Sequence, residues 1–484
     1  MKKRKVNRRK GIRAYLLGIL AISMIVLIGQ LLFLRMLPME ISIVAISILF
    51  ILWLLMCLLQ YHRRVNKFNR MLGKMIIILL SGALIFVNIY VFQAGDTLRK
   101  ISGAMTKTDA ISVIVLKDSS AKVLEDVKGK TFGIQAVIDR LNTDAAIDNI
   151  KGKLNQELNV EEYKTYDELA KSLYSKEVEA IIMNEAYRGT LEEIYPNFQT
   201  ETRVIYQHAI ETQLAELSKS VNVTKDTFNI FISGVDTYGP IGTSSRSDVN
   251  MVATVNPITK QVLLTSIPRD YYVKLSCVNG AYDKLTHAGI YGIDCSVGTI
   301  ENLFGININY YARVNFSSLI NIVDALGGIY VNSPQAFTSN DGYSFSAGRN
   351  YLNGEQALSF SRDRYHQEGG DRGRGKNQMR VIEGIISKAI SPSIITNYSG
   401  IMSALSGSFQ TNLESREITD IIKMQLQDMS SWTIIQNSVD GTGGTDYAYS
   451  LGNNAYVMYP DASTVEYAKQ LIQKVQRGEA IPNS

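Results

Sequence analysis

The stretch NMVATVNPITKQVLLTSIPRD, residues 250–270, decides how the C-terminal part of this chain folds. Asn250–Asn256 and Gln261–Ile267 are rich in apolar and β-branched residues, which favour strands. The Asn-Pro pair at 256–257 lies between them and is a turn signal. The stretch therefore predicts a β-hairpin, which needs further strands and helices to bury its apolar faces.

Strands and helices follow one another on both sides of this hairpin. Further strands are predicted at Thr227–Gly234 and Tyr310–Phe316, and helices at Tyr282–Ile290, Cys295–Phe304, Ser317–Leu326 and Asn377–Ala389. Ser317 is a possible N-cap of its helix, and Gly327-Gly328 is the expected stop. The mixture predicts an α/β domain with a mixed sheet covered by helices over residues 222–391, which residues 392–484 continue.

A separate accessory α/β domain is predicted over residues 108–215, after a polar linker at 96–107. Ala110–Leu116 and Val178–Met183 predict strands, and Thr165–Ser175 predicts a helix. The stretches VKGKTFGIQ and YDELAKSLYSKEVEAIIMN are similar to one lobe of an extracellular solute-binding protein. The alternative is a domain that only packs or spaces, and neither interpretation names a ligand site.

Three uncharged apolar runs occupy the first 95 residues, at Ala14–Leu34, Ile41–Leu59 and Met75–Phe92. Each is near the roughly 20 residues that a helix needs to cross a bilayer. A cleaved signal peptide would resemble the first run, but the Arg35 region is no small-residue cleavage site and two more runs follow. Residues 1–95 are therefore predicted to be a membrane anchor of three transmembrane helices.

The net charge of +5 conceals a division of the chain. Residues 1–95 hold 14 Lys and Arg residues against one acid, Glu40, a charge of +13. Residues 96–484 hold 36 basic and 44 acidic residues, a charge of −8, so no nucleic-acid partner is expected there. The N-terminus and the loop between the second and third runs are basic and should be cytoplasmic. Three crossings then place the rest of this multi-pass cell-membrane protein outside the cytoplasm.

The cysteines agree with an extracellular location. Cys57 lies in the second apolar run, whereas Cys277 and Cys295 are the only two cysteines of the outer part. A compartment that permits oxidation makes a disulfide between them possible. The alternative is a pair of unbonded, buried thiols.

The common signals of hydrolases are missing: G-x-S-x-G does not occur, and the four histidines have no metal-like spacing. What remains is a set of arginines, carboxylates and one glutamine beside predicted strand ends and helix starts. Its members are Asp236, Arg246, Asp248, Arg269, Asp270, Arg362, Asp363, Arg364, Asp371, Arg372, Arg374 and Gln378.

This set has the composition that phosphoryl transfer requires. Asp236 and Asp248 are 12 positions apart, so their carboxylates could meet across a loop and hold a hard cation through oxygen ligands. Arginine binds phosphate through two parallel hydrogen bonds, and Gln378 should face inward beside a helix N-terminus, where anions are favoured. An isolated arginine is more often a surface ion pair, which is the expectation for Arg372 and Arg380. Positioning and charge neutralisation are most of what phosphoryl transfer needs.

Four stretches of the chain, in this order, resemble the LytR–CpsA–Psr family of membrane-anchored cell-wall enzymes. They are ISGVDTYGPIGTSSRSDVNMVATVNPITKQVLLTSIPRDYYV, DKLTHAGIYG, VNFSSLINIVDALGGIYV and LNGEQALSFSRDRYHQEGGDRGRGKNQMRVIEGI, within residues 227–391. The three apolar runs and the inserted domain are similar to the streptococcal capsule-operon members, the CpsA group. The resemblance implies an α/β/α sandwich that holds a polyprenyl phosphate tail, with apolar segments such as Leu319–Val323 and Val381–Ile386 as its lining.

The resemblance also implies roles for single residues. The implied pyrophosphate-binding residues are Arg269, Arg362, Arg364 and Gln378, with Arg246 and Arg374 nearby. The implied metal ligands are Asp236 and Asp248, with Mg²⁺ or Mn²⁺ as the expected ion. The implied catalytic residues are Arg269, Asp248 and Asp371. The general base stays open among Asp236, Asp248 and Asp371.

The implied reaction transfers a glycopolymer, with capsular polysaccharide preferred, from a polyprenyl-pyrophosphate carrier to peptidoglycan. One alternative is a pyrophosphatase that uses water in place of the acceptor at the same site. A second is a membrane-bound regulator or transcriptional attenuator of capsule synthesis, and a third is a ligand sensor centred on residues 108–215. The sequence names no protein partner.

Overall fold

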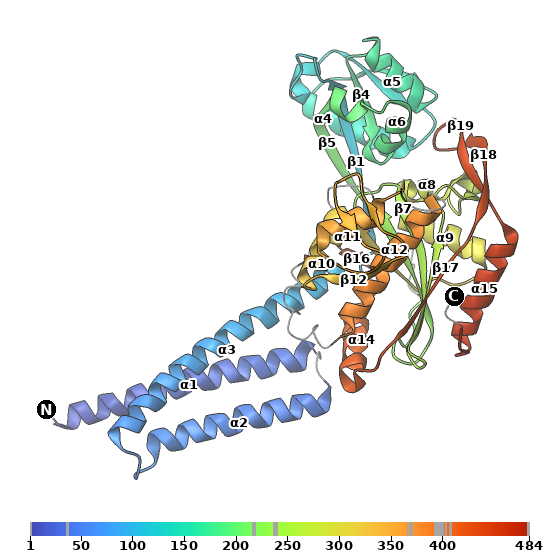
Figure 1. The fold of residues 1–484 in the computed structure, drawn as a ribbon. Coiled ribbons are helices and arrows are strands. Elements are labelled where there is room, and N and C mark those ends of the chain that lie inside the picture. The colour runs from blue at the N-terminus through green and yellow to red at the C-terminus, as the bar shows by residue number, and fades with distance from the viewer. Residues whose placement is uncertain are drawn as a thin grey trace.

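The computed structural model describes residues 2–34, 38–214, 219–235, 241–364, 366, 371–391, 401, 404–405 and 409–481, without the side chains of residues 2–10 and 371. Figure 1 shows a bundle of long N-terminal helices, an α/β unit at the opposite end, and a larger α/β unit between the two. We name the smaller unit, residues 106–213, the accessory unit, and the larger one, residues 228–476, the main unit.

The N-terminal bundle consists of α1 (Lys2–Leu34), α2 (Met39–Tyr61) and α3 (Lys67–Ile101), which contain the three predicted apolar runs. All three helices are long and apolar enough to cross a membrane. They pack on one another through a small core that includes Leu20 and Ile77, while many other apolar side chains are exposed on the outside of the bundle. An apolar outer surface suits lipid, so the bundle fits a membrane anchor.

Helix α3 continues beyond the apolar run and into the main unit. We expected a polar linker over 96–107, yet α3 reaches Ile101 and the next strand begins at Thr106. Ala94, Leu98 and Ile101 are buried against the apolar core of the main unit. The first half of the expected linker is therefore helical and packed, because an apolar stripe persists between its polar residues.

The accessory unit is a five-stranded sheet with the order β3-β2-β4-β1-β5. Its strands are β1 (Thr106–Leu116), β2 (Thr131–Gln135), β3 (Asn159–Tyr163), β4 (Ala180–Asn184) and β5 (Thr202–Gln213). The helix α4 (Arg140–Leu154) packs on one face, and α5 (Tyr166–Tyr174) and α6 (Arg188–Ile194) pack on the other. Successive β1 residues contribute to opposite cores, as the two-residue period of a strand requires.

The main unit is built on a six-stranded sheet with the order β16-β11-β6-β7-β8-β17. Its strands are β6 (Phe228–Val235), β7 (Ser247–Asn256), β8 (Gln261–Ile267), β11 (Tyr310–Asn315), β16 (Phe409–Thr411) and β17 (Thr433–Ser438). The predicted hairpin is present as β7 and β8, which are antiparallel. Parallel pairs β6–β11 and β8–β17 make the sheet mixed, as predicted.

Helices cover both faces of this sheet and give an α/β/α sandwich (Figure 1). On one face lie α8 (Leu285–Tyr291), α9 (Ile293–Phe304) and α15 (Ala462–Gln476), and on the other α10 (Phe316–Ala325), α11 (Gly354–Arg362) and α12 (Asp371–Ala389). Val252 packs toward α8 and α9, whereas its neighbours Met251 and Ala253 pack toward α12. The alternation along β7 therefore specifies two cores, one for each helical layer.

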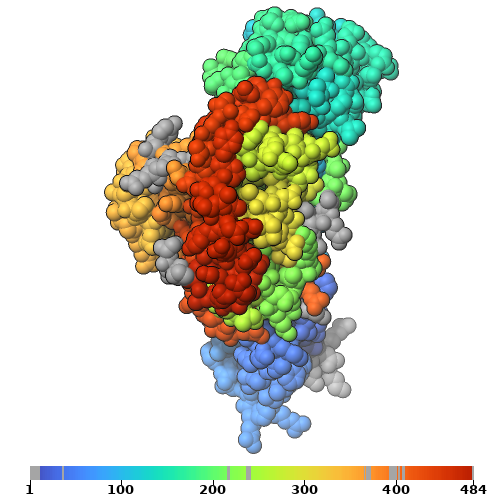
Figure 2. All heavy atoms as spheres, turned by 90° about the vertical axis from the view of Figure 1, so that its right-hand side faces the viewer, coloured from blue at the N-terminus to red at the C-terminus, as the bar shows by residue number. Residues whose placement is uncertain are grey.

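Smaller elements complete the main unit. They are β9 (Tyr272–Lys274), β10 (Tyr282–Lys284), β12 (Ile329–Ser333), β13 (Phe337–Thr338), β14 (Ser344–Phe345), β15 (Gly348–Leu352), α14 (Ser415–Asp428), β18 (Gly441–Ala448) and β19 (Asn453–Pro460). Figure 2 shows the C-terminal residues running down one face of the main unit, with the accessory unit at one end and the N-terminal helices at the other.

Three predicted boundaries differ from the structure. The helix expected at Tyr282–Ile290 begins with a short strand, β10. The cap of α10 is Asn315, whose side chain accepts a hydrogen bond from the Ser318 backbone N–H, and not Ser317. The helix expected at Asn377–Ala389 begins six residues earlier, at Asp371. Gln378 therefore lies two turns inside α12 and not beside its N-terminus.

Cys277 and Cys295 form a disulfide, with their Cα atoms 5.4 Å apart. The bond joins the loop after β9 to the first turn of α9, and Cys295 is buried in the core beneath that helix. The covalent link thus fixes the loop that follows Arg269 and Asp270 to one helical layer.

Candidate functional site

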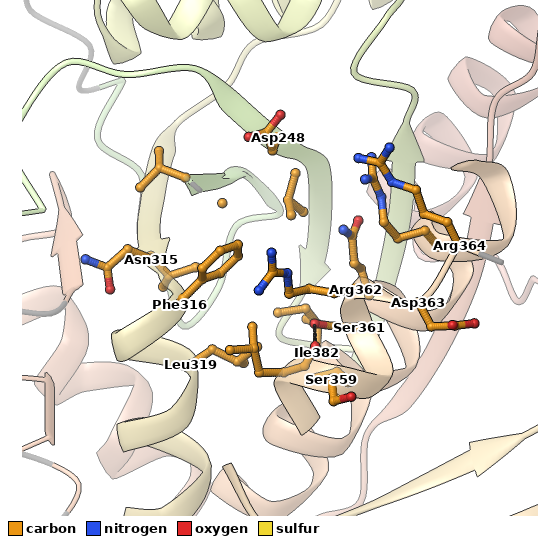
Figure 3. Close-up of a pocket in the computed structure, with 18 of the residues that line it drawn as sticks. Asp248, Asn315, Phe316, Leu319, Ser359, Ser361, Arg362, Asp363, Arg364 and Ile382 are labelled. Carbon is orange, nitrogen blue, oxygen red and sulfur yellow. Dashed lines mark hydrogen bonds between the residues drawn. The ribbon is translucent and has the colours of Figure 1, made fainter. Parts of the chain in front are cut away.

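A cavity of about 350 Å³ lies between one end of the main sheet and the helices α10, α11 and α12. Its lining combines apolar side chains with arginines, and Figure 3 shows Arg362 reaching toward its middle. The cavity includes most of the residues that the sequence singled out. From that set, the lining contains Asp248, Arg269, Arg362, Asp363, Arg364, Arg374 and Gln378.

Strand directions explain why distant residues meet at this cavity. β6, β8 and β11 run the same way, and β7 runs opposite to them. The ends of β6, β8 and β11 therefore meet the start of β7 at one edge of the sheet. Asp248 is the second residue of β7, and Arg269 follows β8 by two residues. Side chains at such an edge are the usual ligand-binding groups of open α/β sheets.

Asp248 and Arg269 form an ion pair in the lining of the cavity. Arg269 Nη1 donates to Asp248 Oδ1 at 2.7 Å, and only 19% and 13% of the two side chains are exposed. Burial works to raise the pKa of Asp248, but Arg246, Arg269 and Arg374 outweigh it and hold that pKa below its usual value. Asp248 is therefore an anion at neutral pH.

Helix α11 supplies a second arginine to the cavity. Asn353 caps this helix by accepting a hydrogen bond from the Gln356 backbone N–H. Gly354 abuts α10 so closely that a Cβ would lie 2.4 Å from the Ile320 carbonyl oxygen. This contact brings the end of α11 beside α10, where the guanidinium of Arg362 stacks on Phe316 at 4.4 Å from the ring centroid. Asp363 points away from Arg362 in Figure 3.

The apolar part of the cavity lies between the sheet and the helical layer. Its side chains come from β6, β11, α10 and α12, and they include Ile232, Val314, Leu319, Val381 and Ile382. The expectation that Leu319–Val323 and Val381–Ile386 line the cavity holds for Leu319, Val381 and Ile382. Val323 instead belongs to the core behind it. One cavity thus joins an apolar surface to a cluster of positive charges.

Arg246 is a predicted site residue that does not line the cavity. Its Nη1 lies 2.5 Å from Glu193 Oε1 on α6 of the accessory unit, and it is not among the residues that line the cavity. Arg372 is exposed and pairs with Asp440, as expected of a surface arginine. Arg380 donates to Asn377 and also lies outside the cavity.

The structure tests the expected metal site only in part. Asp236 lies outside the described residues, and so does the side chain of Asp371. Among the described residues, no three His, Cys, Asp or Glu side chains are placed to hold a metal ion. Within the same residues, however, Asp248 Oδ2 is buried and has no hydrogen-bond partner. A buried anionic oxygen without a donor fits a cation ligand.

Two residues of the site did not emerge from the sequence. Phe316 stacks on Arg362, and Thr286 Oγ1 lies 3.4 Å from Asp248 Oδ1. Both stand in stretches already noted for their resemblance, VNFSS and DKLTHAG, which was the only signal available. His287, in the second stretch, is fully buried and bonded through Nδ1 to Asp283 Oδ1 at 2.6 Å, so it belongs to the core.

Comparison with known proteins identifies the main unit. The profile of the LytR_cpsA_psr family matches residues 190–473. A second profile, described as DNA polymerase processivity factor, matches residues 70–183, a range that begins inside the apolar helix α3. The acidic charge of the outer part gives that second match no electrostatic support.

Named relatives agree with the first match. The chain is 40% identical over 238 residues to an Enterococcus faecalis protein named polyisoprenyl-teichoic acid–peptidoglycan teichoic acid transferase TagU, covering 48% of this chain and 77% of the relative. It is 35% identical over 248 residues to the protein of the same name from Bacillus licheniformis, covering 49% and 79%. The crystal structure of Bacillus subtilis TagU is 32% identical, with a TM-score of 0.42, and the match covers 53% of this chain and all of that one.

The profile match covers more than half of the chain, and it contains every strand of the six-stranded sheet and all the described residues of the arginine-lined cavity. The relatives are matched over most of their own length. This protein belongs to the LytR_cpsA_psr family.

Proposed function

We propose that this protein is a phosphotransferase that moves a glycopolymer from a polyprenyl-pyrophosphate carrier to peptidoglycan. The observation that carries the proposal is a single cavity in which an apolar lining meets a cluster of arginines. The apolar part suits a prenyl tail, and the arginines suit a pyrophosphate. The printed names of the relatives describe transfer of teichoic acid to peptidoglycan and support the same class of reaction.

The arginines would bind the pyrophosphate and neutralise its charge. Arg269, Arg362, Arg364 and Arg374 all line the cavity, together with Gln378. Arg269 is held by Asp248, and Arg362 is held by its stack on Phe316. Fixed guanidinium groups need little reorganisation when charge develops in the transition state, so they lower the barrier.

In the proposed reaction, an acceptor sugar hydroxyl of peptidoglycan attacks the phosphorus that carries the glycopolymer. A new phosphodiester bond forms, and the bond from that phosphorus to the prenyl phosphate breaks. The leaving prenyl phosphate takes the electron pair, and the arginines stabilise its charge. The hydroxyl proton passes to a carboxylate, for which we propose Asp371 with Asp236 as the alternative. The arginines around Asp248 hold its pKa low and make it a weak base.

A divalent cation also fits the proposal. We propose that Asp248 and Asp236 hold Mg²⁺ or Mn²⁺, since the buried Oδ2 of Asp248 lacks a hydrogen-bond donor among the described residues. Such an ion supplies further neutralisation of phosphate oxygens. The experiment is a titration of Mg²⁺ against the parent chain and against Asp248→Asn, in which the variant should bind more weakly.

The proposed location follows from the charge asymmetry around the apolar helices. Basic residues cluster before α1 and between α2 and α3, which indicates a cytoplasmic N-terminus and an extracellular main unit. Reporter fusions after Ser484 test this: a reporter active only outside the cytoplasm should work, and activity of a cytoplasmic reporter would contradict the cell-wall role.

The decisive experiment uses the full chain in lipid nanodiscs with a lipid-pyrophosphate-linked glycan donor and a peptidoglycan acceptor. Arg269→Ala should lower transfer by about 100-fold, the loss typical for removing a group that stabilises transition-state charge. Arg416→Ala, an exposed arginine on α14, is the control and should transfer like the parent. If Arg269→Ala keeps the parent rate, the cavity is not the active site.

The same assay separates the alternatives. Release of phosphate without transfer, in the presence of acceptor, would favour a pyrophosphatase, and inactivity on every donor would favour a regulator. We prefer capsular polysaccharide as the polymer because the layout of three helices and an inserted unit resembles the CpsA group. Faster transfer of a teichoic-acid donor than of a capsule donor would overturn that choice.

A further inference from the structure

One arginine of the main unit, Arg246, packs against helix α6 of the accessory unit. Gly189 and Glu193 are four residues apart on α6 and therefore face the same way. The guanidinium of Arg246 lies against this face, where a Cβ on Gly189 would be 2.7 Å from Nη2. Glu193 Oε1 accepts a hydrogen bond from Arg246 Nη1 at 2.5 Å. A side chain at 189 would therefore displace the Arg246 guanidinium from this position.

Glu193 also contacts a second buried cation of the main unit. Lys284, at the end of β10, donates through Nζ to Glu193 Oε2 at 3.3 Å, and only 6% of its side chain is exposed. Burial works to raise the pKa of Glu193, but Lys284 and Arg246 outweigh it and hold that pKa below its usual value. Glu193 is thus an anion between two cations of the other unit.

The charges continue from Lys284 to the cavity. Lys284 Nζ lies 3.6 Å from Asp270 Oδ1, and Asp270 Oδ2 lies 3.7 Å from Arg269 Nε. Arg269 then pairs with Asp248 at 2.7 Å. Each of these four side chains is less than one fifth exposed, so water screens them weakly. A chain of alternating charges therefore runs from the accessory unit to the residues that line the cavity.

We propose that Glu193 is a positioning residue of the phosphate-binding cavity, so that the accessory unit completes the active site of the main unit. Glu193 does not line the cavity and acts through Lys284 and Asp270 on Arg269, and through Arg246 on the field around Asp248. The inference rests on the proposed function for its effect on turnover, but its effect on pyrophosphate binding is independent of that function.

Loss of the Glu193 charge should separate binding from turnover. Glu193→Gln leaves Arg246 and Lys284 without their anion, so the cavity becomes more positive and binds pyrophosphate about threefold more tightly. Turnover should fall about tenfold, because Arg269 loses the chain that fixes it and misplacement of a catalytic group is costly. A residue that merely docked the two units would weaken binding and turnover together.

The test uses the full chain in nanodiscs, with geranyl pyrophosphate as the binding probe in calorimetry and the transfer assay for turnover. Glu192→Gln is the matched control, because Glu192 neighbours Glu193 on α6 but acts on Arg188 within the accessory unit. Gly189→Ala is the second variant, since it displaces Arg246 while keeping every charge. It should lower turnover without tightening the binding of geranyl pyrophosphate.

Tighter probe binding with slower turnover in Glu193→Gln, and parent-like values in Glu192→Gln, would support the inference. Unchanged probe affinity in Glu193→Gln, or a parallel loss of affinity and turnover, would overturn it. If the parent chain itself transfers nothing, the proposed function fails, and the shift in probe affinity still decides whether Glu193 controls the cavity.

Discussion

The accessory unit and the main unit share one architecture but differ in what the side chains at their strand ends do. Each is a mixed sheet with helices on both faces. In the accessory unit, polar side chains at the strand ends are hydrogen-bonded within the unit: Asn184 Nδ2 donates to Asp139 Oδ2 at 2.7 Å, and Gln135 Nε2 donates to the Lys164 carbonyl. In the main unit, charged side chains at the sheet edge face a cavity.

The difference shows that the layered fold does not by itself provide a site. Function depends on which side chains the strand ends carry and on whether those groups satisfy one another or remain directed at a ligand. The accessory unit then affects chemistry only through what it presents to its neighbour, as Glu193 does. Changes in the main unit should alter its stability or its chemistry. Changes in the accessory unit should alter only stability, except at the residues that contact the main unit, Gly189 and Glu193.

Removal of the disulfide should have the largest effect, and it should separate the two units. The double variant Cys277→Ser, Cys295→Ser frees a loop with a sequence separation of 18, which should cost the main unit about 3 kcal/mol. Hydrogen exchange should show lost protection in β8 but not in β4, and Cys57→Ser is the control. Equal loss of protection in both sheets would mean that the units unfold together.

Arg362→Ala should affect chemistry almost as much, without affecting stability. Transfer should fall about 100-fold, or about 2.7 kcal/mol, because the cavity loses a fixed cation. Arg349→Ala is the matched control, since Arg349 also stacks on an aromatic ring, Tyr330, but lies outside the cavity. An equal loss of transfer in both variants would show that the rate depends on stacking of an arginine on an aromatic ring, and not on the position of Arg362 in the cavity.

The accessory unit should show a pH dependence that the cavity does not. Burial raises the pKa of Asp139 to about 6 and Asp109 adds to the rise, whereas Asn184, Asn142 and Lys107 oppose it. A raised carboxyl pKa favours the protonated form of the folded state. The accessory unit should therefore lose about 2 kcal/mol of stability as pH rises from about 4 to about 6, and stay level above that.

Hydrogen exchange of β4 amides across this pH range measures the effect of Asp139. Asp139→Asn, which keeps a side chain that tolerates the positive φ of 58° at this position, should remove the pH dependence. Transfer activity measured at one pH should be the same in both proteins. A pH dependence that persists in Asp139→Asn would assign it to another group.

The smallest expected effect concerns the apolar lining. Leu319→Asn puts an amide where the cavity is apolar, so the KM for a polyprenyl donor should rise about tenfold, or about 1.4 kcal/mol. Binding of inorganic pyrophosphate should not change. Leu141→Asn, on an accessory-unit leucine that is 88% exposed, is the control. An equal loss of pyrophosphate binding would show that Leu319 supports the arginines and not the tail.

Much of the main unit was predictable because its signals are local. The hairpin of β7 and β8, the sheet type and the arginines near strand ends all follow from period, turn residues and position. The start of α12 was not predictable from periodicity, because residues 371–376, DRGRGK, have no apolar stripe and include two glycines. The first turns of α12 contain Arg374, which lines the cavity. The sequence of these turns therefore serves the cavity at the expense of helix propensity.

The partner of Arg246 could not be predicted from the sequence, for a different reason. Glu193 lies 53 residues away in another unit, and no local pattern couples them. The same holds for the stack of Arg362 on Phe316, which depends on how closely α10 and α11 approach. Contacts between elements fix the last details of the site, and a single sequence encodes them only through the complete fold.

Helix α3 joins the apolar bundle to the main unit and fixes the distance between them. Its 35 residues span about 52 Å, against a hydrocarbon core of about 30 Å. The helix is therefore longer than the hydrocarbon core, and its last turns are packed into the main unit and not hinged to it. The cavity is held at one height above the membrane surface. For the transfer reaction that we propose, only acceptor strands at that height would be within reach of the cavity.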